Sequence, residues 1–288
     1  MIPILPGVSA IADRYDAFVL DLWGVLHDGV TAYPGARDCL EKLKAAGKRT
    51  VLLSNAPRRA SYLVEMMEDL GIPRSAYDEI ISSGEVVWRN LKERTAPGYA
   101  DLGRNLAFIG NDRDRHIYEG MGYTCVDDPA KADFVVVCGP ADFDDLLDVY
   151  RPIVAAFRHL PPMICANPDR RVIRDGKVVV CAGNIADLFA ELGGTVISTG
   201  KPDGAIYDDA LALIGSPPKS RVLGVGDAFP TDVTGCAAAG IDELLICGGI
   251  HAEELGIAWG EAPTPEALAG LAARYTPQPV AAVPAFRW

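Results

Sequence analysis

From about residue 17 onward, short apolar runs alternate with amphipathic segments, and this alternation is the strongest constraint on the fold. Short apolar runs are typical of buried β-strands, and strands that alternate with helices are typical of parallel sheets with crossover connections. We therefore predict an α/β fold whose core is a Rossmann-like, doubly wound parallel sheet. The predicted core strands are 17–20, 50–53, 222–225 and 244–246, and the first predicted helices are 35–46 and 57–70.

Between two parts of this core pattern, residues 85–194 contain strands and helices of their own. They include apolar runs at 106–109 and 134–137, a helix near 143–157 and a hairpin at 172–180 that turns on Asp175-Gly176. We expect the core to resume with a strand at 196–198, and the proline-rich tail after Thr276 to form an extended surface strap. The expected domains are a core of residues 1–84 and 195–288 and an inserted α/β cap of residues 85–194.

The charge balance limits which partners are plausible. Asp and Glu outnumber Lys and Arg by 39 to 27, which gives a net charge of −12. Because this field repels polyanions, nucleic acid and anionic membrane surfaces are not expected partners. A small anionic substrate stays compatible if a cation and a few basic side chains reverse the sign inside one pocket.

The cysteines and the hydropathy pattern bear on the compartment. The seven cysteines are odd in number and far apart, and they form no C-x-x-C pair. They are predicted to be buried free thiols in a reducing cytoplasm. The N-terminal apolar stretch lacks a basic region and is broken by prolines, and no later apolar run reaches membrane-spanning length. We therefore expect a cytoplasmic protein without a membrane partner.

Polar residues follow several predicted strands directly, at the sheet edge where open parallel sheets bind their ligands. These residues are Asp21, Ser54 with Asn55, Lys201, and Asp227 with Asp232. They supply a carboxylate to attack phosphorus, a hydroxyl and an ammonium group to hold phosphate oxygens, and acids to hold a hard cation. Mg²⁺ suits such a set because it prefers oxygen ligands and usually takes only one or two protein carboxylates. Each element alone is an ordinary cap or turn, but four in order favour a phosphoryl-transfer site.

This ordered set resembles the four motifs of the haloacid dehalogenase-like superfamily. The insertion between the second and third motifs, its Asn167-Pro168-Asp169 sequence and the later Gly200-Lys201-Pro202 resemble one subclass more closely. That subclass contains the NagD-like and p-nitrophenylphosphatase-like sugar and nucleotide phosphatases, which carry an α/β cap. The resemblance implies a magnesium-dependent hydrolase that cleaves a small phosphate monoester, such as a sugar phosphate or nucleotide-like metabolite, through an aspartyl-phosphate. It also implies a homodimer formed through the cap.

The resemblance assigns expected roles residue by residue. The expected catalytic residues are Asp21 as nucleophile, Ser54 as a hydrogen-bonding partner of the phosphoryl group and Lys201 as its counter-charge. The expected metal ligands are Asp21, the backbone carbonyl of Trp23, Asp227 and, mostly through water, Asp232. The expected substrate-binding residues are Asn55, Arg59, Asn167 and Asp169.

Trp23 departs from the family pattern. Phosphatases of this superfamily normally have a second Asp two residues after the nucleophile, where it acts as general acid and base. An indole carries one N–H donor but no acid or base that works near neutral pH, and losing general acid–base catalysis costs about 10²–10⁴ in rate. His27 and Asp28 are candidate replacements, although Asp28-Gly29 is also a standard turn pair and both residues are compatible with a purely structural turn.

Two other functions stay open at this point. Haloacid dehalogenases also have an aromatic residue at the position of Trp23 and need no metal, so a metal-independent dehalogenase is one alternative. A non-catalytic regulatory protein that binds a phosphate ligand is the other, because Trp23 is compatible with a site that has lost turnover.

Overall fold

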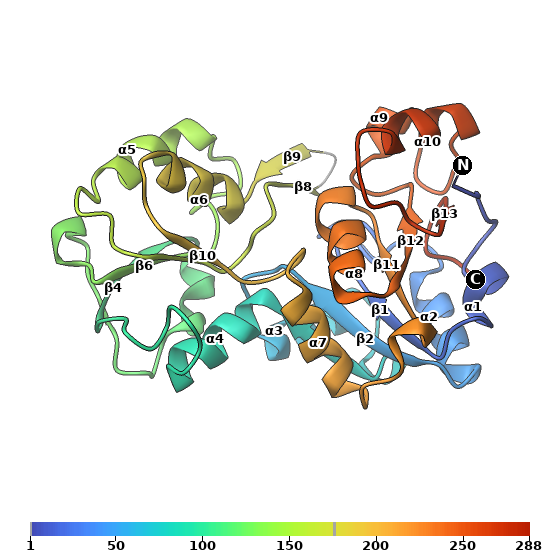
Figure 1. Cartoon of the computed structure of the whole chain (residues 1–288), viewed down its shortest axis with the longest axis horizontal. Helices are drawn as coiled ribbons and strands as arrows, with labels where there is room; N and C mark the ends of the chain where they lie inside the picture. Colours follow the sequence, from blue (N-terminus) through green and yellow to red (C-terminus); the bar gives the residue numbers. More distant parts are fainter. Residues whose placement is uncertain (1, 175–176) are drawn as a thin grey trace.

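The computed structural model describes residues 2–174 and 177–288, which form two lobes that each contain a parallel sheet (Figure 1). The first sheet has the strand order β13-β12-β11-β1-β2-β3, and the second has the order β10-β7-β6-β4-β5. Every strand pair within these two sheets is parallel. This arrangement confirms the predicted α/β class, with a Rossmann-like parallel core and a second α/β lobe.

The strands of the first sheet are β1 (Ala17–Leu20), β2 (Arg49–Ser54), β3 (Glu79–Ser82), β11 (Val222–Gly226), β12 (Asp242–Ile246) and β13 (Ala281–Val283). Those of the second sheet are β4 (Asn105–Ile109), β5 (Thr124–Cys125), β6 (Phe134–Val137), β7 (Met163–Cys165) and β10 (Val196–Ser198). An antiparallel pair is formed by β8 (Arg171–Arg174) and β9 (Lys177–Val180). The predicted hairpin turn at Asp175-Gly176 lies outside the described residues.

The helices that accompany the first sheet are α1 (Ser9–Ala12), α2 (Ala36–Ala45), α3 (Ala60–Asp69), α7 (Gly204–Leu213), α8 (Thr234–Ala239), α9 (Ala252–Leu255) and α10 (Pro265–Ala272). Those that accompany the second sheet are α4 (Ser83–Glu93), α5 (Tyr150–Ala155) and α6 (Ala182–Glu191).

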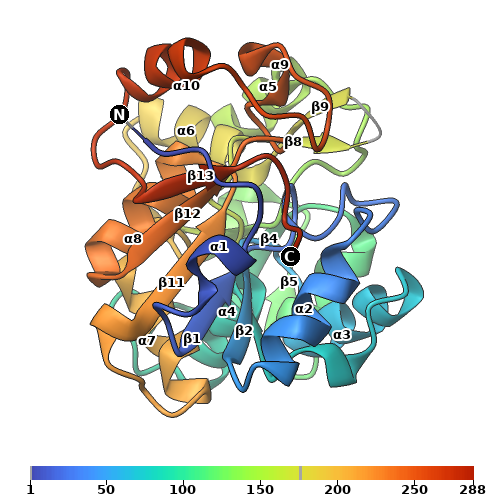
Figure 2. The same ribbon diagram turned by 90° about the vertical axis from the view of Figure 1, so that its right-hand side faces the viewer.

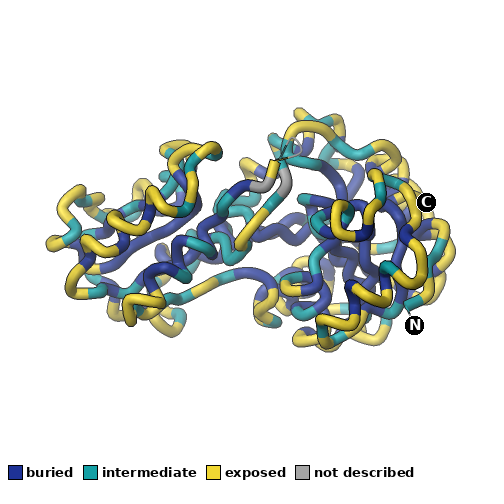
Figure 3. The backbone as a smooth tube through the Cα atoms, turned by 90° about the horizontal axis from the view of Figure 1, so that it is seen from above, coloured by how far each residue is buried: buried dark blue, intermediate teal, exposed yellow. Residues whose placement is uncertain are grey.

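Helices cover both faces of the first sheet. Successive side chains of a strand point to opposite faces, so Phe18 joins the apolar cluster closed by α2 and α3, whereas Val19 joins the cluster closed by α7 and α8. All four residues of β1 are therefore buried. Strands buried on both faces have continuous apolar sequences, which is why the core strands could be recognised. Figure 3 shows the strands as buried tubes, with the exposed residues on the outside of both lobes.

The second sheet is also covered on both faces. Val135 packs with α5 and α6, whereas Val136 on the opposite face packs with Leu91 of α4. Since α4 begins directly after β3 of the first sheet, this helix carries the chain from one lobe to the other. We propose that the second sheet with these three helices forms the cap domain, and that the first sheet with its helices forms the core.

Strand β10 differs from the sequence prediction. Residues 196–198 were expected to return to the core, but Ile197 pairs with Ile164 of β7 in the second sheet. A three-residue apolar strand fits either sheet, and nothing local to it determines which strand it pairs with. The proposed cap therefore extends to Ser198, beyond the expected boundary at residue 194.

The helix expected near 143–157 is shorter than predicted. A 3₁₀ turn at Leu147–Val149 leads into α5, and the residues before it form no helix. Asp142 Oδ1 accepts a hydrogen bond from the Asp144 N–H at 3.0 Å, and Asp145 Oδ2 accepts one from the Asp142 N–H at 3.1 Å. Such side-chain bonds to the backbone compete with helix formation.

The prediction that the chain after Thr276 forms a surface strap is wrong for residues 281–286. Residues Ala281–Val283 form β13 at the edge of the first sheet, and Phe286 beyond them is fully buried. In Figure 2 this strand lies beside β12, with the N-terminal segment next to it, where Ile4 forms a bridge with Ala282. A short edge strand tolerates nearby prolines because few of its N–H groups are needed for pairing.

All seven cysteines are free thiols and six of them are buried, as predicted, but Cys125 is exposed, because its short strand β5 lies at the edge of the second sheet. Across residues 2–174 and 177–288, the structure contains no helix that combines the length and the apolar character needed to cross a bilayer.

Gly84, in the first turn of α4, provides a test of how tightly the start of this helix packs. A Cβ atom on Gly84 would lie 2.3 Å from the carbonyl carbon of Pro57, whereas one on Gly270 in α10 would have no atom within 4 Å. We expect Gly84→Ala to lower the free energy of unfolding by about 1–3 kcal/mol, because backbone must shift to admit the methyl group. We expect Gly270→Ala to raise it by about 0.4–1 kcal/mol, because alanine loses less entropy in a helix. Urea unfolding of both variants measures the contrast, and equal changes would contradict the close packing.

Candidate active site

Asp21 lies at the carboxyl end of β1, in the centre of the first sheet. Its N–H donates to the Val225 carbonyl at 2.9 Å, which continues the pairing of β1 with β11 by one residue. Its carboxylate turns back, so that Oδ1 accepts a hydrogen bond from the Leu22 N–H at 2.8 Å. The sheet therefore fixes the backbone of Asp21, and its own loop fixes the side chain.

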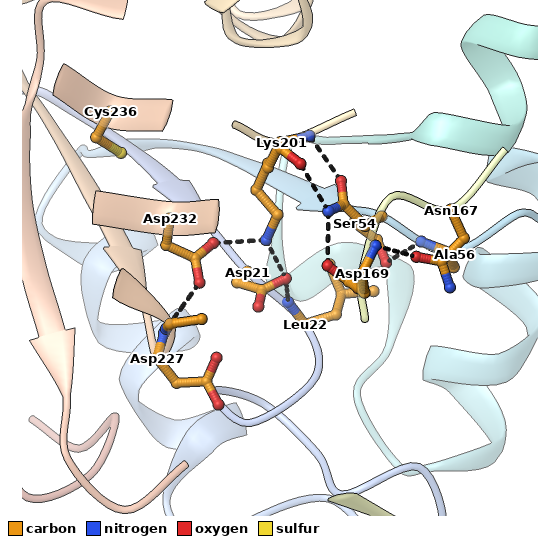
Figure 4. A network of polar contacts seen from close by, with 12 residues as sticks. Asp21, Leu22, Ser54, Ala56, Asn167, Asp169, Lys201, Asp227, Asp232 and Cys236 are labelled. Carbon is orange, nitrogen blue, oxygen red and sulfur yellow. Dashed lines mark hydrogen bonds and ion pairs between the residues drawn. The ribbon is translucent and has the colours of Figure 1, made fainter. Parts of the chain in front are cut away.

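Lys201 lies between two carboxylates (Figure 4). Its Nζ is 2.7 Å from Asp21 Oδ1 and 2.6 Å from Asp232 Oδ1, and the lysine side chain is only 4% exposed. Burial alone would lower the pKa of Lys201, but Asp21 and Asp232 outweigh burial and raise it, so the ammonium group stays protonated. Burial raises the pKa of Asp21 to about 7 although Lys201 acts in the opposite direction. A further cation near Asp21 would favour its ionised form.

Asp227 completes a group of acids that fits a hard cation. One carboxylate oxygen from each of Asp21, Asp227 and Asp232 lies within 4.8 Å of the other two. Burial raises the pKa of Asp227, and the charges of Asp21 and Asp232 raise it further. Three carboxylates beside one lysine leave an excess of buried negative charge, which a divalent cation with oxygen ligands would offset. The donor set therefore fits Mg²⁺.

Two glycines allow Asp227 to occupy this position. A Cβ atom on Gly24 would lie 1.9 Å from Asp227 Oδ2, and one on Gly249 would lie 2.1 Å from the same oxygen. Gly24 also has a φ of +85°, a left-handed conformation that favours glycine. The Ile250 N–H then donates to Asp227 Oδ2 at 2.7 Å. The close approach of two backbone segments thus holds the carboxylate in one orientation.

Asp232 supports the loop as well as the lysine. A π-helical turn at Phe229–Val233 brings its side chain back toward the end of β11. Oδ2 accepts hydrogen bonds from the Asp227 N–H at 3.2 Å and the Ala228 N–H at 3.0 Å, while Oδ1 contacts Lys201. Both oxygens of Asp232 are therefore engaged by protein groups.

Asn55 connects the two lobes at this site. Its Oδ1 accepts from the Lys201 N–H at 2.7 Å, and its Nδ2 donates to the Lys201 carbonyl at 3.1 Å. The same Nδ2 donates to Asp169 Oδ1 at 2.8 Å, and the Asp169 N–H donates to Asn167 Oδ1 at 3.0 Å. Burial raises the pKa of Asp169, opposed by Lys201 and the bond from Asn55. A loop of the second lobe is thereby hydrogen-bonded to the floor of the site.

These groups face a cavity of about 680 Å³ between the lobes. The sequence-predicted residues that line it are Asp21, Trp23, Ser54, Asn55, Asn167, Asp169, Lys201 and Asp227. Asp232 lies behind Lys201, outside the lining. Arg59 is also outside it, because its guanidinium is 3.3 Å from the Glu85 carboxylate and 3.6 Å from the Trp88 ring centroid. The structure therefore brings together all predicted site residues except Arg59.

The sequence reasoning missed four arginines that line the cavity, Arg58, Arg113, Arg171 and Arg174. Arg58 adjoins Arg59 in the same loop, so only the packing of Arg59 against Trp88 distinguishes the two. The other three come from the second lobe and follow no motif.

His27 and Asp28 are poorly suited to replace the missing acid. His27 Nδ1 accepts a hydrogen bond from the Gly29 N–H at 2.9 Å, and burial lowers the pKa of His27 to about 4, so the ring is neutral at neutral pH. Burial acts to raise the pKa of Asp28, but hydrogen bonds from the Thr31 and Val30 N–H groups outweigh it and lower the pKa. Asp28 is thus an ionised turn residue. This geometry favours the turn interpretation for both residues.

Comparison with known proteins agrees with the site. Residues 18–124 match a family model described as haloacid dehalogenase-like hydrolase, and residues 198–273 match one described as HAD-hydrolase-like. A haloacid dehalogenase-like hydrolase from Brucella suis 1330 is 34% identical, with a TM-score of 0.82 over 98% of this chain and 99% of that chain. The chain belongs to the haloacid dehalogenase-like hydrolases.

Two further relatives of this hydrolase carry more specific names. A glycerol-3-phosphate phosphatase from Gallus gallus is 27% identical over 265 residues, covering 85% of this chain and 83% of the relative. The structure of a 4-nitrophenylphosphatase from Thermotoga maritima is 25% identical, with a TM-score of 0.69 and 94% of each chain covered. Both relatives align over the core and the second lobe together.

The acid cluster predicts how the hydrolase binds metal. Replacing Asp227 by Asn removes one negative charge and one ligand oxygen while keeping the shape of the side chain. We expect Asp227→Asn to weaken Mg²⁺ binding by at least about tenfold, as measured by titration calorimetry. Asp148→Asn is the matched control, because the Asp148 side chain is 85% exposed and lies in the second lobe. Unchanged Mg²⁺ affinity in Asp227→Asn would remove this residue from the metal site.

Proposed function

We propose that this hydrolase is a magnesium-dependent phosphatase that cleaves a small phosphate monoester through an aspartyl-phosphate on Asp21. The observation that carries the proposal is the convergence of Asp21, Lys201 and Asp227 at the floor of one cavity. A carboxylate nucleophile, a buried cation and a metal-binding acid are the groups that phosphoryl transfer requires. The names of the two phosphatase relatives support the same chemistry.

The first step needs little proton transfer. Asp21 is the only reacting group the protein must supply: one carboxylate oxygen forms a bond to phosphorus as the bond from phosphorus to the leaving oxygen breaks. Lys201 and the Ser54 hydroxyl would hold the non-bridging phosphate oxygens. Mg²⁺ held by Asp21, Asp227 and the Trp23 carbonyl would add positive charge against the phosphoryl group. Asp169 and Asn167 would close the site from the side of the second lobe and exclude bulk water.

Trp23 matters in the second step for every substrate, and in the first step when the leaving group is poor. A poor leaving group needs a proton as it departs, and hydrolysis of an aspartyl-phosphate is faster when a base activates the water. Trp23 lines the cavity and supplies neither function, and the geometry of His27 and Asp28 does not replace it. The proposed enzyme is therefore slow with alkyl phosphates and retains its phosphoryl intermediate.

A panel of phosphate monoesters, assayed with and without Mg²⁺, tests the function. We expect Mg²⁺-dependent release of p-nitrophenol from p-nitrophenyl phosphate, and no release by Asp21→Asn. Chloride or fluoride release from haloacids without metal would instead support the dehalogenase alternative. Magnesium-dependent binding of esters with no hydrolysis over hours would support a regulatory binding protein.

The kinetics should reveal the missing acid and base. With p-nitrophenyl phosphate we expect a burst of about one p-nitrophenol per active site, followed by slow turnover, because the leaving group hardly needs a proton whereas the intermediate lacks a base. Rapid-quench measurements detect the burst. A linear time course with ordinary phosphatase rates toward alkyl phosphates would contradict it.

Trp23→Asp tests the same point by restoring the carboxyl group. We expect this variant to hydrolyse alkyl phosphates at least about tenfold faster than the wild type, since general acid–base catalysis is worth about 10²–10⁴ in rate. The ring of Trp23 fills the space beside Gly29, where a Cβ atom would lie 2.3 Å from the indole. Trp23→Phe is therefore the matched control for lost packing. Equal rates in Trp23→Asp and Trp23→Phe would show that the carboxyl group does not act.

A further inference from the structure

Four arginines line the cavity that contains Asp21, and three of them, Arg58, Arg113 and Arg174, are connected through contacts with Asp114 or Phe143. Arg58 lies in the loop between β2 and α3, four residues after Ser54. Arg113 lies in the 3₁₀ turn Asp112–Ile117 that follows β4, and Arg174 ends β8. Of these three, one comes from the first lobe and two from the second, and all line the cavity; the fourth, Arg171, begins β8.

The negative charge around these arginines is insufficient to neutralise them. Asp114, whose side chain is 6% exposed, has its Oδ1 3.3 Å from Arg58 Nε and 3.7 Å from Arg113 Nε. Among the described residues, no acid forms an ion pair with Arg174. Burial lowers the pKa of Arg113, and the charges of Arg58 and Arg174 act in the same direction, while Asp114 opposes them. A single carboxylate therefore faces three guanidinium groups.

Phe143 keeps two of the guanidinium groups close together. The Cζ atom of Arg174 is 4.2 Å from the Phe143 ring centroid, and that of Arg113 is 4.8 Å from it. Stacking on an aromatic ring holds a guanidinium in place while its N–H groups remain available as donors. Two like charges held near one ring repel each other, and an anion between them would remove that repulsion while accepting charge-assisted hydrogen bonds.

We propose that Arg113 and Arg174, with Arg58 beside them, form a second anion-binding subsite. The substrate would carry, besides the phosphate ester at Asp21, a carboxylate or a second phosphate group. This inference rests on the proposed phosphatase function and adds the substrate class to it. The chain has a net charge of −12, which repels anions. The arginines inside the cavity also counter this repulsion for a substrate with two anionic groups.

Packing between the lobes accounts for only part of the cluster. The pair formed by Arg58 and Asp114 joins the loop after β2 to the turn after β4, and so has a structural role without any ligand. That role needs neither Arg113, which is 43% exposed, nor Arg174. Substitution of Arg113 and Arg174, the two arginines that stack on Phe143, therefore tests ligand binding without removing the ion pair between Arg58 and Asp114.

Matched pairs of esters test the subsite. Glycerol 3-phosphate and 3-phosphoglycerate differ in whether the far end is a hydroxymethyl group or a carboxylate, and a hexose 6-phosphate and its 1,6-bisphosphate differ by one phosphate. In at least one pair, we expect the wild type to favour the ester with the second anionic group by at least about tenfold in kcat/KM. Which pair shows the preference identifies the second group as carboxylate or phosphate.

The variants Arg113→Met and Arg174→Met remove the charge but keep side-chain length, and the double variant should bring that ratio close to one. Arg174→Lys, which retains the charge, should keep a clear preference, and Arg151→Met on the exposed face of α5 is the control with an unchanged ratio. Circular dichroism checks that each variant folds. A wild type with no preference in either pair, or a preference that survives the double variant, would overturn the subsite.

A failure of the phosphatase proposal is distinguishable from a failure of the subsite. If the wild type hydrolyses none of these esters, the proposed function fails. The subsite is then tested by calorimetry, which measures the binding affinity of the same pairs of esters with Mg²⁺ present. Tighter binding of the doubly anionic member that the double variant abolishes would support the subsite. Equal binding of both members would overturn it.

Discussion

The buried contact of Lys201 with Asp21 and Asp232 is the interaction on which the arrangement of the molecule depends. Removing such charges from water costs several kcal/mol each, which the structure offsets by placing them 2.6–2.7 Å apart. Lys201 follows β10 of the second sheet, whereas both carboxylates follow strands of the first. The backbone of Lys201 is also held by Asn55, which bonds to Asp169. One residue therefore joins the Asp21 carboxylate, the loop after β11 and the second lobe.

The cavity is lined by both an acidic and a basic group of side chains. At the floor, Asp21, Asp227 and nearby Asp232 exceed the charge of Lys201, so this end attracts a cation before it can hold a phosphate. Elsewhere in the lining, Arg58, Arg113 and Arg174 exceed the charge of Asp114. A substrate with separated anionic groups matches this distribution once a metal is bound, and the wall of the second lobe then contributes to selectivity as well as to exclusion of water.

The sequence allowed the central strands to be predicted because each strand is a continuous apolar run, and it indicated which polar residues would meet because most of them lie close after a strand. Where prediction failed, distant contacts decide the structure. Ile197 has the sequence of a core strand, but its partner is Ile164. Arg58 and Arg59 are neighbours of the same type, and only Trp88 and Glu85 determine which of them faces the cavity. The edge strand after Thr276 likewise depends on β12, which lies more than thirty residues earlier in the chain.

Trp23 separates two contributions to phosphoryl transfer that usually occur together. Electrostatic groups aimed at developing charge are worth about 10²–10³ each, and a general acid and base together are worth about 10²–10⁴. The first kind depends on Lys201, Asp21 and Asp227, whose positions are fixed by strand ends and by the close approach of Gly24. The second depends on one side chain in the loop after β1. Because the loop backbone that shapes the acid cluster is set by Gly24 and not by residue 23, an indole at that position is compatible with an intact electrostatic site. In the proposed mechanism, this indole would remove proton transfer and leave the groups around the phosphorus atom in place.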